Sequence, residues 1–121
     1  MDIPGTILKF AGVAPPRALD GRSLHQIVLG NQPASWRQRV VIENPVDRKW
    51  EMYREFQPAA GKDFAFIRHL YDPRPVEFYD LKVDEYQLAS KSAMVTQDMH
   101  YKLDRLTSLN GANLRAVEQE A

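Results

Sequence analysis

The sequence predicts an α+β fold, in which a roughly four-stranded antiparallel sheet is packed by a C-terminal helix and preceded by short helices. Two observations predict this fold. Four short segments typical of strands lie between residues 39 and 81, and the turns between them are too short for parallel crossovers. Apolar residues at helical spacing then recur between residues 92 and 109. With 121 residues the chain has the length of one domain, so we expect a single layered unit.

Residues 1–30 form the predicted helical lead-in. The carboxylate of Asp2 is placed to cap a first helix. Ser23 and Gln26 have the spacing of a capping box, which predicts a second short helix over residues 24–29. The apolar residues of the first helix fall on one face: Ile3, Ile7, Leu8 and Ala11.

Residues 39–81 carry the predicted antiparallel strands. The β-branched run 40–42 favours a short buried strand. Over residues 50–56, mostly apolar side chains alternate with mostly polar ones, which indicates a strand with two different faces. The segment 63–70 is interpreted as a strand buried on both faces, and residues 76–81 as the next strand.

The last third of the chain is predicted to be helical. A packing helix is expected over residues 92–109, and residues 112–121 form either a further short helix or a tail. The residues that define the apolar face of the packing helix are Val95, Met99, Leu103 and Leu106.

The charge balance and the absence of cysteine exclude several classes of protein. Sixteen Lys and Arg residues balance sixteen Asp and Glu residues, whereas a nucleic-acid binder or an anionic-membrane binder needs a basic excess. Without cysteine there is no disulfide, thiolate metal site or cysteine nucleophile. We expect no membrane span, because no apolar run approaches the length needed to cross a bilayer. The start of the chain lacks the charged and apolar regions of a signal peptide, although a fragment could have lost one.

Motifs for catalysis and metal binding are not found. The three histidines, His25, His69 and His100, lie far apart, and none forms a helical pair of metal ligands. Asp84 and Glu85 are adjacent, but neighbouring side chains point apart, which favours a solvated turn over an acid–base pair. The sequence therefore predicts no catalytic, cofactor-binding or metal-binding residue in this chain.

Two segments resemble the sulfatase family. Residues 2–13, with Pro16 and then Asp20-Gly21-Arg22-Ser23-Leu24, are similar to a sulfatase segment that usually reads D-I-x-P-T-I-L-x-x-A-G-V, then P, then D-G-x-S-L. Residues 76–88 are similar to E-L-Y-D-L-x-x-D-P-x-E-L, near the C-terminus of the family. The departures are Gly5 and Glu85, which replace prolines of the family pattern, and Gln87, which replaces a glutamate.

The resemblance implies that this chain is a C-terminal segment of a sulfatase, related to alkaline phosphatases. Sulfatases use a formylglycine made from the Cys or Ser of a C/S-x-P-x-R motif, together with a calcium ion. In the nearest string here, residues 13–17, Val13 stands at the nucleophile position. Calcium and formylglycine are therefore expected only in a larger N-terminal domain, and this chain alone is expected to be inactive.

By the same resemblance, the chain is a structural portion of a sulfatase that borders its substrate. Candidate rim residues are Arg54, Arg68 and His69, since cationic donors suit a sulfated ligand. An ordinary salt bridge or an exposed strand position is the more common explanation for such residues. The expected partners are the N-terminal domain or a second copy, through exposed apolar surface, and weakly a sulfated ligand. The alternatives are a free-standing, non-catalytic interaction module with the same fold, or a complete small enzyme, which would need a site that the sequence does not show.

Overall fold

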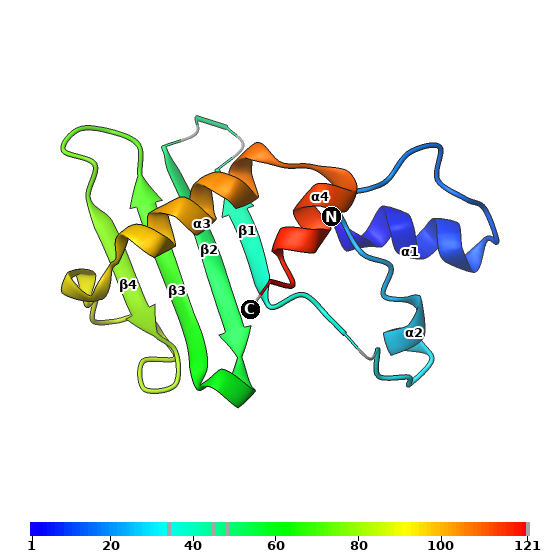
Figure 1. Cartoon of the computed structure of the whole chain (residues 1–121), viewed down its shortest axis with the longest axis horizontal. Coiled ribbons are helices and arrows are strands. Elements are labelled where there is room, and N and C mark those ends of the chain that lie inside the picture. The colour runs from blue at the N-terminus through cyan, green and yellow to red at the C-terminus, as the bar shows by residue number, and fades with distance from the viewer. Residues whose placement is uncertain (34, 45, 48, 121) are drawn as a thin grey trace. The chain divides into compact units, whose positions relative to one another are not determined.

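The computed structural model describes residues 1–33, 35–44, 46–47 and 49–120 (Figure 1). Contacts divide the chain into two compact units. Unit 1 joins the two ends of the chain, Met1–Arg37 and Ser108–Ala121, and unit 2 is the central stretch Gln38–Thr107. The single-domain organisation expected from the sequence stays a prediction.

Unit 2 is built on a four-stranded sheet (Figure 1). All neighbouring strands are antiparallel, and their spatial order follows the sequence order. This confirms the predicted antiparallel sheet. The physical reason for the pairing is that the short turns between the strands permit only antiparallel neighbours. The strands are β1 (Arg39–Glu43), β2 (Trp50–Gln57), β3 (Lys62–His69) and β4 (Val76–Asp80).

The turn between β2 and β3 is a short 3-10 segment, η1 (Pro58–Ala60), followed by Gly61. Gly61 has a φ of 66°, a left-handed conformation that glycine adopts without steric cost. The predicted burial of β3 on both faces holds only at its centre. Ala65 and Phe66 are buried on opposite faces, whereas the other β3 residues are half-buried. The prediction was therefore wrong toward both ends of the strand.

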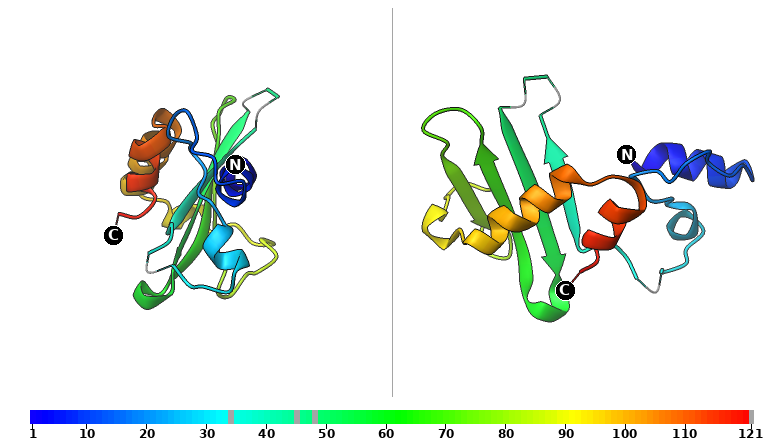
Figure 2. Two further views of the ribbon diagram at one scale, coloured as in Figure 1. Left: turned by 90° about the vertical axis from the view of Figure 1, so that its right-hand side faces the viewer. Right: turned by 45° about the horizontal axis from the view of Figure 1, so that its top comes forward.

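Helix α3 (Gln97–Ser108) packs on one face of the sheet (Figure 2). Leu103 and Leu106 are buried there, and the ring of His100 meets the ring of Phe66 edge-on at 5.0 Å. The predicted packing helix is confirmed, but its predicted start was wrong. A 3-10 turn, η2 (Ser92–Met94), precedes it, and Val95 is extended, so Val95 lies outside the helical face.

The start of α3 is set by Thr96. Its carbonyl accepts the N–H groups of Met99 and His100, and its hydroxyl lies 3.4 Å from the Met99 nitrogen. A threonine in this position satisfies N–H groups that have no partner within the first helical turn. The helix therefore begins after Thr96 and not at residue 92.

The alternation of two side-chain faces predicted for residues 50–56 is present in β2. Helix α3 covers the face whose side chains are mostly polar in the sequence. Glu51, Tyr53, Glu55 and Gln57 are buried, whereas Trp50, Met52, Arg54 and Phe56 lie on the opposite face and are half-buried or exposed. Among the residues that the structure describes, no α-helix of unit 2 covers that opposite face, called the open face here (Figure 2). By strand register the open face consists of Val40, Ile42, Trp50, Met52, Arg54, Phe56, Asp63, Ala65, Ile67, His69, Glu77 and Tyr79.

The described residues of unit 1 form the short helices α1 (Asp2–Phe10), α2 (His25–Val28) and α4 (Gly111–Val117). For residues 112–121 the sequence left open a short helix or a tail. The structure has a helix there, because α4 occupies the first part of that stretch. Leu114 and Val117 of α4 are buried. No helix in the described part of the chain is long and apolar enough to cross a membrane.

Both predicted helix caps of unit 1 were wrong. Met1 occupies the N-cap of α1, and the Asp2 carboxylate accepts hydrogen bonds from Arg22 and Arg37 instead. Ser23 accepts the N–H of His25, but Gln26 does not return a bond, because its side chain pairs with Asn31. Longer-range donors thus take the carboxylate of Asp2, whereas other local hydrogen bonds take the side chains of Ser23 and Gln26.

Helix α1 presents apolar side chains outward. Ile3, Ile7 and Phe10 are 60%, 61% and 52% exposed, and these three residues are called the α1 stripe. The predicted apolar face is therefore divided, since Leu8 is half-buried and Ala11 is exposed. The buried residue of α1 is Thr6.

Candidate functional site

The three candidate rim residues do not form one cluster. Arg68 and His69 are neighbours on β3, so their side chains point to opposite faces of the sheet. Arg68 lies on the face covered by α3, where it donates to Glu51 and to Asp104 of α3. The distance from Arg68 Nη2 to Asp104 Oδ1 is 2.6 Å. Arg68 is thus a link between sheet and helix.

Arg54 and His69 share the open face. Arg54 is opposite Ala65 in the register and donates to Asp63 at 2.8 Å. His69 is four positions further along β3 than Ala65, which separates the two candidates by about 13 Å along the strand. Their binding of a sulfated ligand stays a prediction, with Arg54 and His69 on one face and Arg68 on the other.

On the open face, His69, Glu77 and Tyr79 form a chain of hydrogen bonds. The Nε2 of His69 lies 2.5 Å from one oxygen of Glu77, and the hydroxyl of Tyr79 donates to the other oxygen. The bond from Tyr79, followed by the bond from His69, lowers the pKa of the Glu77 carboxyl group. The hydrogen bond from Tyr79 to Glu77 also raises the pKa of the Tyr79 hydroxyl. Glu77 is therefore an anion held by two neighbours.

Beneath α3, Glu55 is a buried carboxylate with three partners. Arg39 donates to it at 3.1 Å, Gln57 donates at 2.8 Å, and the Lys62 ammonium lies 3.3 Å away. Buried charges need such pairing, because their desolvation is otherwise costly. Tyr53, next to this cluster, has a buried hydroxyl with no hydrogen-bond partner among the described residues, and burial raises its pKa.

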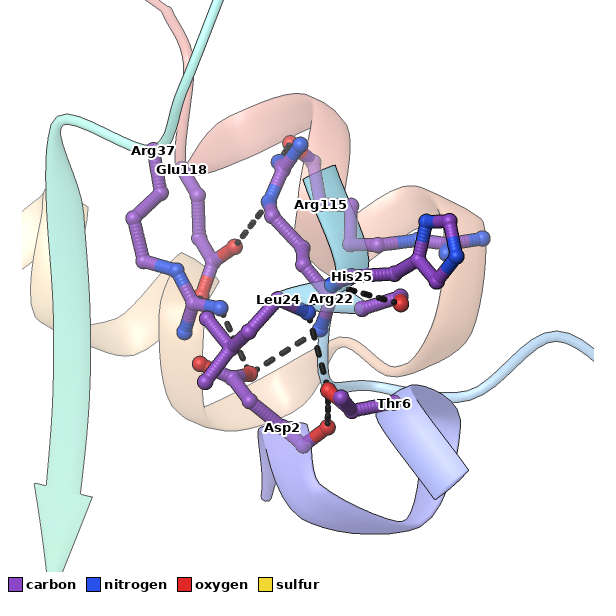
Figure 3. A network of polar contacts seen from close by, with 9 residues as sticks. Asp2, Thr6, Arg22, Leu24, His25, Arg37, Arg115 and Glu118 are labelled. Atoms are coloured by element: carbon purple, nitrogen blue, oxygen red, sulfur yellow. Dashed lines mark hydrogen bonds and ion pairs between the residues drawn. The ribbon is translucent and has the colours of Figure 1, made fainter. Parts of the chain in front are cut away.

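In unit 1, four charged side chains meet in one network (Figure 3). Arg22 pairs with Glu118 at 3.2 Å, and Arg37 lies 2.6 Å from Asp2 and 3.8 Å from the second oxygen of Glu118. Burial raises the pKa of Glu118, while Arg37 and Arg22 oppose this effect. Burial also acts to raise the pKa of Asp2, but the bonds from Arg37 and from the Arg22 N–H outweigh it and lower that pKa. Two carboxylates thus balance two guanidinium groups.

The D-G-x-S-L segment joins both ends of unit 1. The carboxylate of Asp20 accepts the N–H of Gly111 at 2.5 Å, at the start of α4. Gly21 is buried against Met1, and a Cβ atom at position 21 would lie 2.0 Å from the Met1 carbonyl oxygen. Only glycine permits this close approach of two backbones.

The same segment is also tied to α1 through hydrogen bonds (Figure 3). The N–H of Arg22 donates to the Asp2 carboxylate at 2.9 Å, and the N–H of Leu24 donates to the Thr6 hydroxyl at 2.8 Å. That hydroxyl donates in turn to the carbonyl of Asp2. The motif residues of unit 1 therefore make structural contacts with one another.

Acidic residues of the second sulfatase-like segment stabilise the turn after β4. Asp80 accepts the N–H of Lys82 at 3.2 Å. Asp84 accepts the N–H groups of Leu88 and Ala89 at 2.9 and 3.0 Å, and these two bonds lower its pKa. Both carboxylates are thus used within the chain's own turns.

A hollow of about 450 Å³ in unit 1 is lined mainly by apolar groups. Val13 and Pro15, from the string that resembles P-x-R, contribute to this lining, together with Leu8 and Leu19. These four apolar side chains offer neither a nucleophile nor metal ligands. Lys9, Ser23 and Arg115 also border the hollow.

A comparison with protein families identifies the chain. The family described as N-sulphoglucosamine sulphohydrolase, C-terminal, matches residues 1–109. The chain belongs to this family. Membership in the sulphohydrolase C-terminal family confirms the resemblance to sulfatases that the two motif segments indicated.

Two solved structures resemble the chain. The structure of BT4656 in complex with its substrate D-glucosamine-2-N,6-O-disulfate has a TM-score of 0.61 and 25% identity over 88% of this chain. The phosphonate monoester hydrolase SpPMH from Silicibacter pomeroyi has a TM-score of 0.48 and 22% identity, also over 88%. This chain spans only 22% and 23% of those two chains. No curated protein matches it.

The described residues do not fit the two groups that sulfatases use. No three His, Cys, Asp or Glu side chains gather as metal ligands in the described part of the sequence. The carboxylates of Asp2, Asp20, Glu77 and Asp84 accept hydrogen bonds from the chain's own donors. Valine at position 13 cannot become an aldehyde. That calcium and formylglycine belong to a larger N-terminal domain stays a prediction.

Sequence reasoning missed Arg37 and Glu118 as members of the unit 1 network. Neither residue lies in a motif segment, and no local spacing links them to Asp2 or to Arg22. The only signal was the D-G-x-S-L segment itself, which contains Arg22 but does not specify its partner. Contacts between the two ends of the chain could not be read from either end alone.

Proposed function

We propose that the chain is the C-terminal structural and substrate-rim portion of a sulfatase-type hydrolase that cleaves sulfate esters. The family match over residues 1–109 carries this proposal. The fold of BT4656, whose substrate is a sulfated glucosamine, supports it. The whole enzyme's reaction would then take place in a part of the protein that this chain does not match.

The isolated chain is proposed to be inactive toward sulfate esters. Attack on sulfur requires an activated nucleophile and stabilisation of the sulfate oxygens. The chain has no cysteine, and Val13 occupies the place of the nucleophile in the nearest matching string. Asp2, Asp20 and Asp84, from its motif segments, accept structural hydrogen bonds.

Arg54 is the rim candidate best placed to meet a sulfated ligand. It is 45% exposed at its side chain and has one carboxylate partner, Asp63. Arg68 is held by two carboxylates on the other face, and His69 is held by Glu77. Binding to the isolated chain should be weak, because few charged contacts offset the cost of ordering the ligand.

The test is an assay of the purified chain with calcium, a chromogenic aryl sulfate and D-glucosamine-2-N,6-O-disulfate, with and without the formylglycine-generating enzyme. We expect no turnover above a buffer blank. Turnover that persists through further purification would show that the chain holds an active site of its own, against the proposal.

A free-standing, non-catalytic interaction module with the same fold would be equally silent in that assay. The α1 stripe, which is exposed in unit 1, suits a docking role in either case. The reading frame upstream of Met1 separates the two functions. A C/S-x-P-x-R motif in that frame supports the sulfatase portion, and a frame without one supports the module.

A further inference from the structure

A second hollow of unit 1, called the Trp36 hollow here, has a volume of about 480 Å³ and is lined by residues from both ends of the chain. Most of its lining side chains carry polar groups, and none of the described lining residues is acidic. A concave surface with an aromatic ring and a few convergent polar groups is typical of a small-molecule site. The residues that carry these groups are Arg22, Ser23, Ser35, Trp36, Arg115 and Gln119.

The indole ring of Trp36 is held in position by its neighbour in the chain. The guanidinium carbon of Arg37 lies 5.4 Å from the centroid of this ring, and Arg37 is itself paired with Asp2 at 2.6 Å. Trp36 is half-buried and lines the hollow. One face of a pyranose ring carries C–H groups, which pack well on the electron-rich face of an indole. Trp36 therefore offers a platform for a sugar ring.

The two arginines of the Trp36 hollow differ in how their charge is compensated. Arg22 is paired with Glu118, whereas the guanidinium group of Arg115 has no ion-pair partner among the described residues. The bond from Arg22 to Arg115 ends on the backbone carbonyl of Arg115 and does not use its side chain. A guanidinium group binds two oxygens of a sulfate or carboxylate at once. The hollow therefore suits a ligand with an anionic group.

The remaining polar groups match the hydroxyl groups of a sugar, which both donate and accept hydrogen bonds. Gln119 donates from Nε2 to the hydroxyl of Ser35 at 3.2 Å. That bond does not use the Oε1 acceptor of Gln119 or the hydroxyl hydrogen of Ser35. Ser23 accepts the N–H of His25 and can donate its own hydroxyl hydrogen. The lining thus offers both donors and an acceptor.

We propose that the Trp36 hollow binds an anionic saccharide, with the sugar ring on Trp36 and the sulfate or carboxylate group on Arg115. This inference goes beyond the proposed function, because the hollow belongs to unit 1 and the rim candidates Arg54, Arg68 and His69 belong to unit 2. It concerns binding and involves no catalytic step.

An anion with an alkyl chain is the competing ligand, because Ser23 and Arg115 also border the apolar hollow of unit 1. Ser35 and Gln119 favour the saccharide. Sugar hydroxyls would pair with these two side chains, whereas an alkyl chain in the Trp36 hollow would bury their polar groups without partners, which is costly.

The test is isothermal titration calorimetry of the full chain with D-glucosamine-2-N,6-O-disulfate, N-acetylglucosamine, inorganic sulfate and octyl sulfate. The variants of the hollow are Trp36→Leu and Arg115→Gln. Their matched controls are Trp50→Leu and Arg17→Gln, at positions that do not line the hollow. Arg54→Gln tests the rim candidate separately. Circular dichroism and the unfolding midpoint show whether each variant keeps its fold.

We expect the disulfate to bind with a Kd on the order of 1 mM, because few contacts offset the cost of ordering the ligand. Arg115→Gln should raise the Kd about tenfold and Trp36→Leu about fivefold, whereas both controls and Arg54→Gln should leave it unchanged. N-acetylglucosamine lacks the anion and inorganic sulfate lacks the ring, so each should bind about tenfold more weakly than the disulfate.

Three results would overturn the inference. The first is absence of binding, and the second is octyl sulfate or inorganic sulfate binding as tightly as the disulfate. The third is loss of binding in Arg54→Gln with Trp36→Leu and Arg115→Gln unaffected. That last result would place the saccharide at the rim and support the proposed function, so the failure of one hypothesis is distinguishable from the failure of the other.

Tryptophan fluorescence provides a second measurement that does not depend on the folding of Trp36→Leu. The sequence has two tryptophans, so Trp50→Phe leaves Trp36 as the single emitter. Titration of Trp50→Phe with the disulfate should change the emission of Trp36, with the same Kd as calorimetry gives. Heat of binding without any change in this emission would show that the sugar does not lie on Trp36, against the inference.

Discussion

Arg22 donates its Nε hydrogen to the carboxylate of Glu118 at 3.2 Å, although the two residues are 96 positions apart in the chain. Glu118 is fully buried at the end of α4, and Arg22 comes from the D-G-x-S-L segment near the N-terminus. The guanidinium group of Arg22 also donates to the carbonyl of Arg115 within α4. A residue of a family motif near the N-terminus therefore binds the C-terminal part of unit 1.

Replacing Arg22 with methionine should lower the free energy of unfolding by about 3 kcal/mol, because a buried carboxylate loses its nearer cation. Of its two ion-pair partners among the described residues, Glu118 would keep Arg37, at 3.8 Å. Urea denaturation followed by circular dichroism measures the loss. Arg17→Met is the matched control, since Arg17 is exposed, and it should leave the midpoint unchanged. Equal midpoints for both variants would contradict a stabilising role of the Arg22–Glu118 pair.

Gly5 and Gly21 should respond oppositely to alanine. Gly5→Ala should stabilise by about 0.5–1 kcal/mol, because alanine favours an α-helix over glycine. The new methyl group would be in ordinary contact with Leu19 at 3.4 Å. Gly21→Ala should destabilise by more than about 2 kcal/mol, because the methyl group would collide with the backbone of Met1. Thermal melts of both variants measure these changes in stability. A melting temperature of Gly21→Ala equal to that of the wild type would contradict the close approach of Gly21 to the Met1 backbone.

Two tyrosine-to-phenylalanine changes should likewise differ in sign. Tyr53→Phe removes a buried hydroxyl that has no partner among the described residues, and should stabilise by about 0.5–1 kcal/mol. Tyr79→Phe removes a donor to the Glu77 carboxylate, and should destabilise by about 1 kcal/mol. Chemical denaturation of the two variants in parallel tests the pair. Destabilisation by Tyr53→Phe would mean that its hydroxyl is hydrogen-bonded.

The carboxylate of Glu77 should contribute stability that depends on pH. Tyr79 and His69 lower its pKa below the ordinary value of 4.5 in the folded chain. Its contribution is therefore complete above the unfolded pKa and is lost as the pH falls through the folded pKa. Glu77→Gln should cost about 1 kcal/mol at pH 7, a difference that shrinks below pH 4.5.

Unfolding midpoints of the wild-type chain and Glu77→Gln between pH 3 and pH 7 provide the measurement. Glu85→Gln, at an exposed position, is the control, and it should leave the unfolding midpoint at pH 7 unchanged. A Glu77→Gln difference that is constant over this range would show that the two hydrogen bonds do not favour the charged carboxylate.

Local pattern was sufficient for the strands and their direction. The β-branched run at 40–42 and the alternation over 50–56 were found as β1 and β2, and short turns left only antiparallel pairing. Local pattern failed at helix starts. Asp2 and Ser23 have the residue types of caps, but donors elsewhere in unit 1 or a shorter local bond took their oxygens. The rim candidates were chosen by charge, which does not specify the side of the sheet.

The sequence by itself determined the α+β composition, the antiparallel order of the strands and the resemblance to sulfatases, because propensity, turn length and motif spacing are properties of neighbouring residues. Only the tertiary structure decided that α3 covers the row with Glu51, Tyr53 and Glu55, and that Arg22 and Arg37 meet at Glu118. Burying a charged carboxylate is costly unless a cation or hydrogen-bond donors from elsewhere in the chain compensate its desolvation. Such partners are brought together by folding and have no signature in local sequence.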